Sequence, residues 1–341
     1  MPRTLVTGAT GFIGKRLVRR LVERGDEVAC LVRAASRTGP LEELGVALCR
    51  GELDDPRGLI AALGGAFEGR GAERLFHLAG LTHAVRYEDF HAANAQGTAN
   101  LLRAAAEAGA PTVVMTSSLA AAGPSTPQAP HNEASPPAPI SNYGRSKLAA
   151  EREARRLAGA APISIVRPPV VFGPGDRDGL ILFKSIRRTG LHVVPQRRGL
   201  PLSLVFADDL VEALLAVAQH GERLAPGGPE GDPHGLYYAA DPAVSSYAEM
   251  GQMAAAAMGK TAWVFRRRKY PFLPVALAGD LMGRVRGKAP LFGMDKLREA
   301  SASGWVCDPA KLIDQTGWAP TRPAAEHYAA TYRWYVEHGW L

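Results

Sequence analysis

Three side chains in the middle of the chain have the chemistry of a proton-transfer site: Ser118, Tyr143 and Lys147. Tyr143 and Lys147 are four residues apart at the start of a helical pattern, so their side chains project from the same helical face. A free tyrosine has a pKa of about 10, and a nearby ammonium group lowers that pKa because it stabilises the phenolate. The pair is therefore a candidate acid/base near neutral pH.

Ser118 follows an apolar, strand-like stretch that ends in Thr116, Ser117 and Ser118. A hydroxyl just beyond a strand points into the cleft at that edge of the sheet, where it can hold a substrate oxygen beside Tyr143. Thr116 and Ser117 compete with Ser118 for this role, and ordinary turn hydrogen bonding is the alternative for both.

A glycine-rich turn near the start of the chain is a candidate anion site. Gly8, Gly11 and Gly14 lie between a short apolar strand (4–7) and a helical pattern (14–24). In such a turn the first glycine allows the tight bend, the second admits a diphosphate, and the third lets helix and strand pack closely. We expect a dinucleotide here rather than an empty glycine turn. Its expected contacts are Gly8, Thr10, Gly11, Phe12 and Ile13.

The second strand (27–32) indicates which dinucleotide binds. An acidic residue at its end would bind the ribose 2′-hydroxyl of NAD, but Val32 occupies that place and Arg33 follows, with Ser36 and Arg37 nearby. An arginine can grip a 2′-phosphate with two hydrogen bonds. The sequence therefore favours NADP over NAD, unless Arg33 stacks on adenine or faces solvent.

Strand-like runs alternate with helical patterns through the first half of the chain. The expected strands are 4–7, 27–32, 47–49, 74–77, 112–116 and 163–167. The expected helices between them are 14–24, 56–63, 92–108 and 143–158, and residues 121–140 read as a long loop. This alternation predicts an α/β fold with a doubly wound parallel sheet of the Rossmann type, whose ligands lie beyond the strand C-termini.

The second half is less regular and mostly helical. Helices are expected at 179–188, 208–218, 247–258, 274–284, 293–300, 309–316 and 323–338, and short strands at 203–206 and 236–239. We expect residues 1–175 to form the NADP-binding domain and residues 203–240 to return to it. Residues 176–202 and 241–341 would then form a smaller substrate-binding cap.

Composition and charge argue against several classes of protein, such as nucleic-acid binders and membrane-spanning proteins. The chain has 341 residues and a formal net charge of +7, without the basic–aromatic stripe or helix-turn-helix of a nucleic-acid binder. Cys30, Cys49 and Cys307 fit neither a metal site nor a disulfide framework, so we expect no metal and a reducing, cytoplasmic location. The first strand leaves no room for a signal peptide, and no apolar run reaches the roughly 18 residues of a membrane span.

Taken together, the motifs resemble those of the extended short-chain dehydrogenase/reductases, and they stand in the order typical of that superfamily. The segments that carry the resemblance are 7–14 (TGATGFIG), 77–80 (HLAG), 94–98 (NAQGT), 116–118 (TSS), 143–147 (YGRSK), 167–176 (RPPVVFGPGD) and 205–209 (VFADD).

The resemblance implies a role for each matching residue. Tyr143 would be the acid/base, Lys147 would hold the nicotinamide ribose and tune Tyr143, and Ser118 would bind the reacting oxygen. The other implied cofactor contacts are Leu78, Ala79, Gly80, Pro168 and, near adenine, Glu52 and Leu53, where the family often has Asp-Leu. Asn94 would be structural or part of a proton relay. The candidate substrate contacts are Thr82, Ser118 and Phe172.

Details of the motifs point to one branch. The 167–174 loop lacks the asparagine that nucleotide-sugar epimerases and dehydratases often carry, and the chain is closer to the dihydroflavonol-reductase-like and 3β-hydroxysteroid-dehydrogenase-like enzymes. This implies an NADP(H)-dependent oxidoreductase that acts on an apolar ketone or alcohol, such as a steroid, β-keto acid or flavonoid. The alternatives are an epimerase/dehydratase with transient hydride transfer and a non-catalytic NADP-binding regulatory or assembly subunit. The resemblance also suggests a homodimer that pairs through helices 92–108 and 143–158.

An apolar stretch from Trp263 to Met282 adjoins the basic runs 266–269 and 284–288. Three interpretations are open. The stretch could be a cap helix packed on the core, a lid over an apolar substrate, or a segment that touches a membrane surface with its basic rim.

Overall fold

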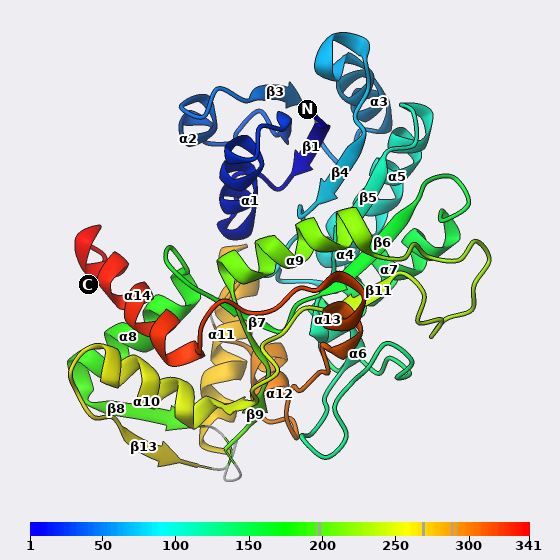
Figure 1. Ribbon diagram of the computed structural model, residues 1–341. Helices are drawn as coiled ribbons and strands as arrows, with labels where there is room; N and C mark the ends of the chain where they lie inside the picture. Colours follow the sequence, from blue (N-terminus) through cyan, green and yellow to red (C-terminus); the bar gives the residue numbers. More distant parts are fainter. Residues whose placement is uncertain (195, 197–198, 268–269, 288, 291) are drawn as a thin grey trace.

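A seven-stranded sheet forms the centre of the protein, as a computed structural model shows (Figure 1). The structure describes residues 1–194, 196, 199–267, 270–287, 289–290 and 292–341. The strand order is β11-β6-β5-β4-β1-β2-β3, and all six pairings are parallel. The strands are β1 (Arg3–Thr7), β2 (Glu27–Val32), β3 (Ala47–Arg50), β4 (Arg74–His77), β5 (Thr112–Thr116), β6 (Ile163–Arg167) and β11 (Leu236–Tyr238).

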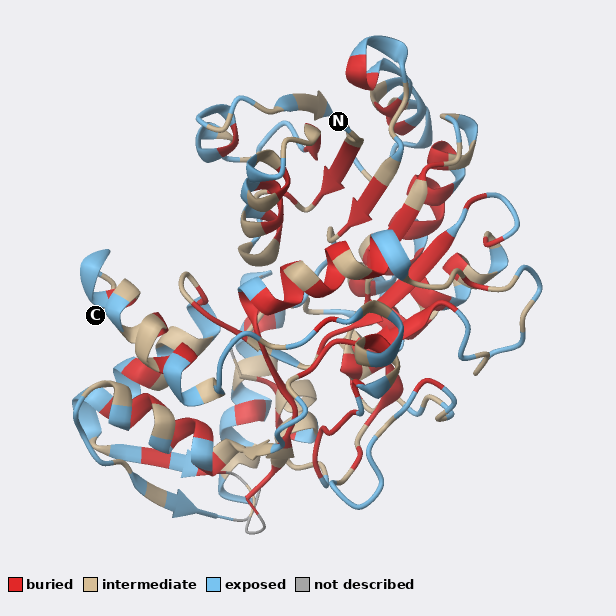
Figure 2. Cartoon of the chain, viewed as in Figure 1, coloured by how far each residue is buried: buried red, intermediate tan, exposed pale blue. Residues whose placement is uncertain are grey.

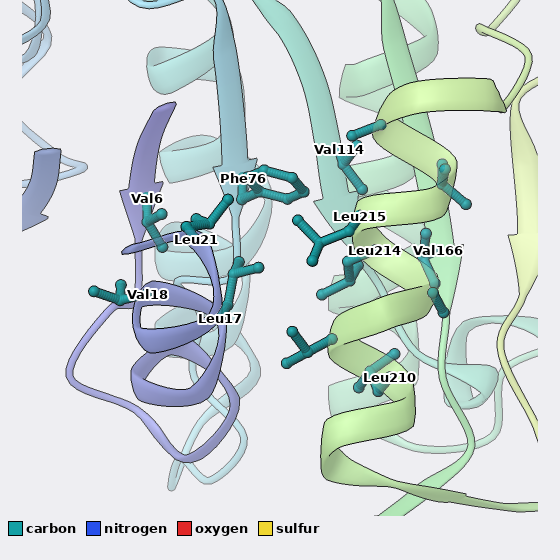
Figure 3. Packing of buried hydrophobic residues seen from close by; sticks show 14 of the residues in the cluster. Val6, Leu17, Val18, Leu21, Phe76, Val114, Val166, Leu210, Leu214 and Leu215 are labelled. Atoms are coloured by element: carbon teal, nitrogen blue, oxygen red, sulfur yellow. The ribbon is translucent and has the colours of Figure 1, made fainter. Parts of the chain in front are cut away.

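Helices cover both faces of this sheet because its strands are apolar on both sides (Figure 2). One face is covered by α1 (Phe12–Glu23), α9 (Ala207–His220) and α13 (Ala310–Thr316), as Figure 3 shows for Leu17, Leu210 and Phe76. The other face is covered by α3 (Pro56–Gly65), α5 (Gly97–Glu107) and α7 (Asn142–Arg156). A fully buried leucine contributes about 1.5–3 kcal/mol, so these two cores hold the cofactor edge of the sheet rigid.

The predicted fold class is confirmed. Six strands fall where the alternating pattern predicted them, and β11 joins the sheet beside β6. The strand order reverses between β4 and β1, so the C-terminal ends of these two strands flank the crevice where such sheets bind ligands.

The rest of the chain forms a smaller, mostly helical cap. Its helices are α8 (Arg177–Thr189), α10 (Tyr247–Ala257), α11 (Leu273–Arg286), α12 (Met294–Ala300) and α14 (Ala324–Glu337), with a short turn η3 (Tyr270–Phe272). Three two-stranded sheets connect it: β7 (Val170–Phe172) with β10 (Leu204–Phe206), β9 (Pro201–Leu202) with β12 (Ser245–Ser246), and β8 (Leu191–Val194) with β13 (Trp263–Arg266).

Three local features differ from the expectations. The helix expected at 92–108 is divided into α4 (Tyr87–His91), a π-helical turn η2 (Ala92–Gln96) and α5. The loop expected at 121–140 is entered through a short helix, α6 (Leu119–Ala122). Strands β7, β8, β9, β12 and β13 were missed because each is short and pairs with a strand distant in sequence. The remaining short elements are α2 (Gly39–Glu42) and η1 (Ala66–Gly69).

Candidate functional site: a dinucleotide cleft and an apolar cavity

The glycine turn between β1 and α1 has the shape of a diphosphate seat. Gly8 has φ of +71°, and a Cβ there would lie 2.6 Å from the backbone nitrogen of Ala79. A Cβ on Gly14 would lie 2.1 Å from the carbonyl oxygen of Gly8. Only glycine fits at these two positions, which leaves the backbone of the turn and the N-terminus of α1 open to an anion. Thr10 and Gly11 lie in this turn, and Phe12 and Ile13 begin α1.

The segment after β4 lies against this turn. The amide of Leu78 donates to the carbonyl of Thr7, and the amide of Ala79 donates to Thr7 Oγ1 at 3.2 Å. His77 bridges Thr7 Oγ1 at 2.7 Å and Thr98 Oγ1 at 2.9 Å. Burial lowers the pKa of His77 to about 3, and the charge of Lys147 lowers it further, so His77 is neutral and structural. The network fixes Leu78 and Ala79 beside the predicted cofactor seat.

Arg33 lies at the end of β2 and is exposed. Its amide donates to Ser36 Oγ at 3.1 Å, and Arg50 Nη1 donates to its carbonyl oxygen at 3.1 Å. The parallel pairing of β2 with β3 brings Arg50 here, opposite Val32. Sequence reasoning missed Arg50, since its proximity depends on strand order. Two residues with guanidinium groups, Arg33 and Arg50, are therefore neighbours at the end of the β2–β3 pair.

Glu52 and Leu53 follow β3. Glu52 is exposed, and the carbonyl oxygen of Leu53 accepts a hydrogen bond of 2.9 Å from Asn100 Nδ2. A Cβ on Gly97 would lie 3.0 Å from Cβ of Leu53, so α5 passes close to this segment. The contacts fix the backbone of Leu53 beside the sheet edge.

Asn94 connects the segment after β4 to helix α7. Its Oδ1 accepts from the amide of Leu81 at 2.7 Å, and its Nδ2 donates to the carbonyl of Leu81 at 3.0 Å and to Ser146 Oγ at 2.9 Å. All polar atoms of the side chain are therefore engaged in positioning the Gly80–Leu81 turn against α7. The residue lies in the π-helical turn η2, and such turns recur at functional sites.

The structure brings Ser118 and Tyr143 together through a close approach of two backbones. A Cβ on Gly144 would lie 2.3 Å from the carbonyl oxygen of Ala120, so α7 reaches α6 only because residue 144 is glycine. Ser141 caps α7 by accepting a hydrogen bond from the amide of Gly144 at 3.0 Å. Ser118 caps α6 by accepting from the amide of Ala120 at 3.1 Å, which leaves its hydroxyl proton for another acceptor.

The environment sets the protonation states of this site. Burial raises the pKa of Tyr143 to about 12, while its hydrogen bond with Ser118 lowers that pKa and the Glu299 carboxylate raises it. Burial lowers the pKa of Lys147 to about 8, and Glu151 raises it. The expectation of a lowered pKa for Tyr143 is therefore wrong for this structure, because burial raises it. At neutral pH Tyr143 is a phenol, and Lys147, one helical turn away, is an ammonium ion.

Lys147 faces the C-terminal end of β5. Its Nζ donates to the carbonyl oxygen of Thr116 at 2.8 Å and would lie 3.6 Å from a Cβ on Gly80. Thr116 Oγ1 is buried and has no hydrogen-bond partner in the described part of the chain. Pro168 is buried, and its carbonyl oxygen accepts from the amide of Leu119. Thr116 thus carries a hydroxyl without a partner in the described part of the chain, at the strand end that Lys147 faces. This edge also carries the glycine turn, so the residues present fit a nicotinamide nucleotide.

A cavity of about 510 Å³ opens beside Ser118 and Tyr143. Most of its wall is apolar, and it includes Leu119, Val170, Leu202, Phe272, Phe292 and Trp305. Lys296 and Glu299 of α12 also line it and form an ion pair of 3.0 Å. The volume is that of a site for a drug-sized molecule, and the two reactive hydroxyls lie at its wall.

Of the three candidate substrate contacts, Ser118 lines this cavity, whereas Thr82 and Phe172 are not among the described residues of its wall. Phe172 is buried in the cap, where its ring stacks on Tyr328 at 4.6 Å between centroids. Thr82 is exposed, and its hydroxyl pairs with His83 Nδ1 at 3.0 Å. No local pattern marked the cavity residues of α12, because a short helix far from Ser118 along the chain supplies them.

Comparison with known proteins agrees with this geometry. Residues 4–229 match the NAD dependent epimerase/dehydratase family. The ceramide reductase of Caulobacter vibrioides (strain NA1000 / CB15N) is 29% identical over 338 residues, which cover 98% of this chain and 95% of that protein. The 3 beta-hydroxysteroid dehydrogenase type 7 of Homo sapiens is 30% identical over 210 residues, 55% of this chain and 54% of that one.

A solved structure is similar over the whole length. The crystal structure of gox2253 has a TM-score of 0.78 and 29% identity, and the match covers 99% of each chain. The resemblance predicted from the motifs is thereby confirmed. The chain belongs to the NAD-dependent epimerase/dehydratase family and is an NAD(P)-dependent oxidoreductase of the extended short-chain dehydrogenase/reductase type.

Proposed function

We propose that this protein is an NADP(H)-dependent reductase of an apolar ketone, or a dehydrogenase of the corresponding alcohol. The observation that carries the proposal is the apolar cavity, because Ser118 and Tyr143 both line it. A ketone carbonyl between these hydroxyls would have its hydrocarbon part against Leu119, Val170 and the aromatic side chains. Ceramides and hydroxysteroids, which the names of two relatives contain, are lipids, and this supports an apolar substrate.

In the reducing direction, Tyr143 Oη gives its proton to the carbonyl oxygen while Ser118 Oγ donates a hydrogen bond to the same oxygen. A bound nicotinamide supplies the hydride. The phenolate left on Tyr143 is stabilised by the ammonium group of Lys147, which Thr116 holds in place. In the oxidising direction the same phenolate accepts the proton of the alcohol.

Arg33 and Arg50 support NADP rather than NAD. Both present cationic side chains at the end of the β2–β3 pair, and no carboxylate follows Val32 to bind a free 2′-hydroxyl. Exchange of Arg33 for aspartate should reverse the preference for NADPH over NADH. Unchanged relative affinities in this variant would remove the basis of the NADP assignment.

The experiment that tests the proposal is a screen that follows NADPH absorbance with ketosteroids, long-chain β-keto compounds, flavanonols and nucleotide-sugars. We expect turnover with the apolar ketones and none in Tyr143→Phe, which should still bind NADPH. Tyr332→Phe, a change in α14 outside the cavity wall, is the matched control. Loss of NADPH binding in Tyr143→Phe would make that variant uninformative, so Tyr143→Met is tested beside it, and full activity in either variant would overturn the mechanism.

A nucleotide-sugar epimerase or dehydratase is the alternative within the family. A sugar diphosphate needs several cationic partners, whereas Lys296, the cation among the described cavity residues, is already paired with Glu299. Tightly retained NAD and turnover of a nucleotide-sugar without net NADPH consumption would select this alternative. A non-catalytic NADP-binding subunit would bind NADPH and turn over nothing, although Tyr143 and Lys147 are both present.

The homodimer and the cytoplasmic location stay predictions. For the dimer we expect pairing through α5 and α7, which light scattering coupled to gel filtration would test. The structure contains, within its described residues, no helix with the length and apolarity needed to cross a membrane.

A further inference from the structure

Helix α11 carries its large apolar side chains on the outside of the protein, the reverse of an ordinary cap helix. Its buried residues are small: Ala276 and Gly283 face the protein, and a Cβ on Gly279 would lie 2.2 Å from the carbonyl oxygen of Phe292. Its exposed apolar side chains are Val275 (59%), Leu277 (58%), Leu281 (66%), Met282 (49%) and Val285 (80%). The helix is thus packed on the protein through its small residues, while its large apolar side chains stay exposed.

The orientation of α11 is fixed by specific contacts. Asp280 Oδ2 accepts a hydrogen bond of 3.2 Å from the amide of Met294, at the start of α12. A Cβ on Gly293 would lie 2.1 Å from Asp280 Oδ1, so the helix and the α12 turn are in close contact. Helix α11 therefore packs on the protein through its small and polar residues. Its exposed apolar side chains form a stripe on the outward face, here called the apolar stripe.

Cationic side chains border this stripe. Arg284 and Arg286 are exposed in the last turn of α11, and Arg266 is exposed at the end of β13. Arg266 lies four residues before Tyr270, so the chain keeps them within about 14 Å of each other. In the part of the chain that the structure describes, no acidic side chain pairs with these arginines. Arg268, Lys269 and Lys288 of the two basic runs lie outside the described residues.

Two large aromatic side chains are exposed in the segments that precede α11. Trp263 on β13 and Tyr270 in η3 are 77% and 62% exposed. Tryptophan and tyrosine are the residues that concentrate at the headgroup level of a bilayer. The apolar stripe therefore has aromatic anchors before it and arginines at its end.

The stripe also adjoins the apolar cavity. Phe272 immediately precedes α11, Phe292 follows it, and both line the cavity. Val193 of β8 lines the cavity as well and is paired in register with Phe265 of β13, which is 45% exposed. The segments that bear the exposed apolar surface are thus continuous with the cavity wall.

We propose that the outward face of α11, together with Tyr270 and the end of β13, docks on a membrane surface that contains anionic lipids. The helix has 14 residues, a length of about 21 Å, and would lie flat with its apolar stripe at the headgroup boundary. Each arginine near such a surface strengthens binding by about fivefold. A second copy of this chain is the other candidate occupant of this face, and the oligomeric state of the variants below tests it.

The docking surface does not depend on the identity of the substrate. One consequence rests on the proposed function: an apolar ketone would enter the cavity from the bilayer. Vesicle binding should be the same for Tyr143→Phe as for the unchanged protein, so failure of the docking proposal and failure of the reductase proposal give different results.

The test is co-sedimentation of the full chain with vesicles of phosphatidylcholine alone or mixed with phosphatidylglycerol. We expect binding to the mixed vesicles, weakened by salt. The double variant Leu281→Glu/Val285→Glu should bind at least about tenfold more weakly, because it places charge on the apolar stripe. Arg284→Gln/Arg286→Gln should lose about tenfold or more on mixed vesicles only.

The matched control is Ile60→Glu/Ile181→Glu, which changes two apolar side chains that are 38% and 51% exposed on α3 and α8. It should bind as the unchanged protein does, and circular dichroism and thermal melting should show that all variants are folded. Absence of binding to the mixed vesicles, or equal binding by Leu281→Glu/Val285→Glu, would overturn the proposal. So would a dimer that this variant converts to a monomer, since a second copy would then cover the face.

Discussion

The Nζ atom of Lys147 lies 2.8 Å from the carbonyl oxygen of Thr116 and donates a hydrogen bond to it. This contact joins the helix that carries Tyr143 to the strand whose end leads to Ser118. It keeps the ammonium group buried, and burial lowers the pKa of Lys147 to about 8. In the proposed mechanism, the charge that would stabilise the Tyr143 phenolate is therefore lost slightly above neutral pH.

The first prediction concerns this pH dependence. Lys147 carries its charge below about pH 8 and loses it above. We expect kcat/KM for ketone reduction, which reports on the free enzyme, to be nearly constant from about pH 6 to 7 and to fall to about half near pH 8. Lys147→Arg keeps its charge because the guanidinium pKa exceeds 12. Any residual activity of this variant should lack the fall, and a fall at the same pH would show that another group titrates.

A second prediction concerns Glu299, whose carboxylate raises the pKa of Tyr143 after the larger effect of burial. Glu299→Gln removes that charge and lowers the tyrosine pKa, so the rise of alcohol oxidation with pH should move to lower pH. The position of that rise is measured from kcat/KM against pH. Glu337→Gln, an exposed change at the end of α14, should leave it where it is. A shift to higher pH in Glu299→Gln would contradict the electrostatic argument.

A third prediction concerns Arg50, which donates a hydrogen bond of 3.1 Å to the carbonyl of Arg33. A hydrogen bond from Arg50 to the charged 2′-phosphate of NADPH would be worth about 1.5–3 kcal/mol. Arg50→Ala should therefore weaken NADPH binding by about tenfold or more, and NADH binding by no more than about twofold. Fluorescence titration of both cofactors measures this. Arg19→Ala, an exposed change on α1, is the control, and equal losses for NADPH and NADH would mean that Arg50 acts only on the turn.

A fourth prediction concerns the stability of the site. Glu151, one turn beyond Lys147, is 1% exposed and accepts hydrogen bonds from Arg167 Nε at 2.8 Å and from Ser117 Oγ. Glu151→Ala leaves the Arg167 guanidinium buried without its counter-charge, so the free energy of unfolding should fall by about 3–5 kcal/mol. Urea denaturation followed by tryptophan fluorescence measures this loss.

The neighbouring pair Glu153–Arg156 supplies the control for that experiment, because both side chains are partly exposed on the same helix. Glu153→Ala should lower the free energy of unfolding by less than about 1 kcal/mol. Similar losses in the two variants would mean that the buried pair contributes no more than a surface pair does.

Much of the fold and the site followed from local sequence. The spacing of Gly8, Gly11 and Gly14 encodes a tight turn in which positions 8 and 14 admit only glycine. The spacing of Tyr143 and Lys147 places both on one helical face. Alternation of strands with helices was enough to predict the parallel sheet, because period and connection length are local properties. These features needed no knowledge of distant contacts.

The tertiary structure decided which residues, distant in sequence, become neighbours. The place of Arg50 beside Arg33 depends on strand order, and the cavity brings together Ser118 and Glu299 from different halves of the chain. The 92–108 segment reads as one helix, yet Asn94 lies in a π-helical turn. The composition of α11 was equally consistent with burial and with exposure. Its outward apolar face arose because glycine and alanine allow a closer approach to the α12 turn than leucine or valine would, a choice that only packing could make.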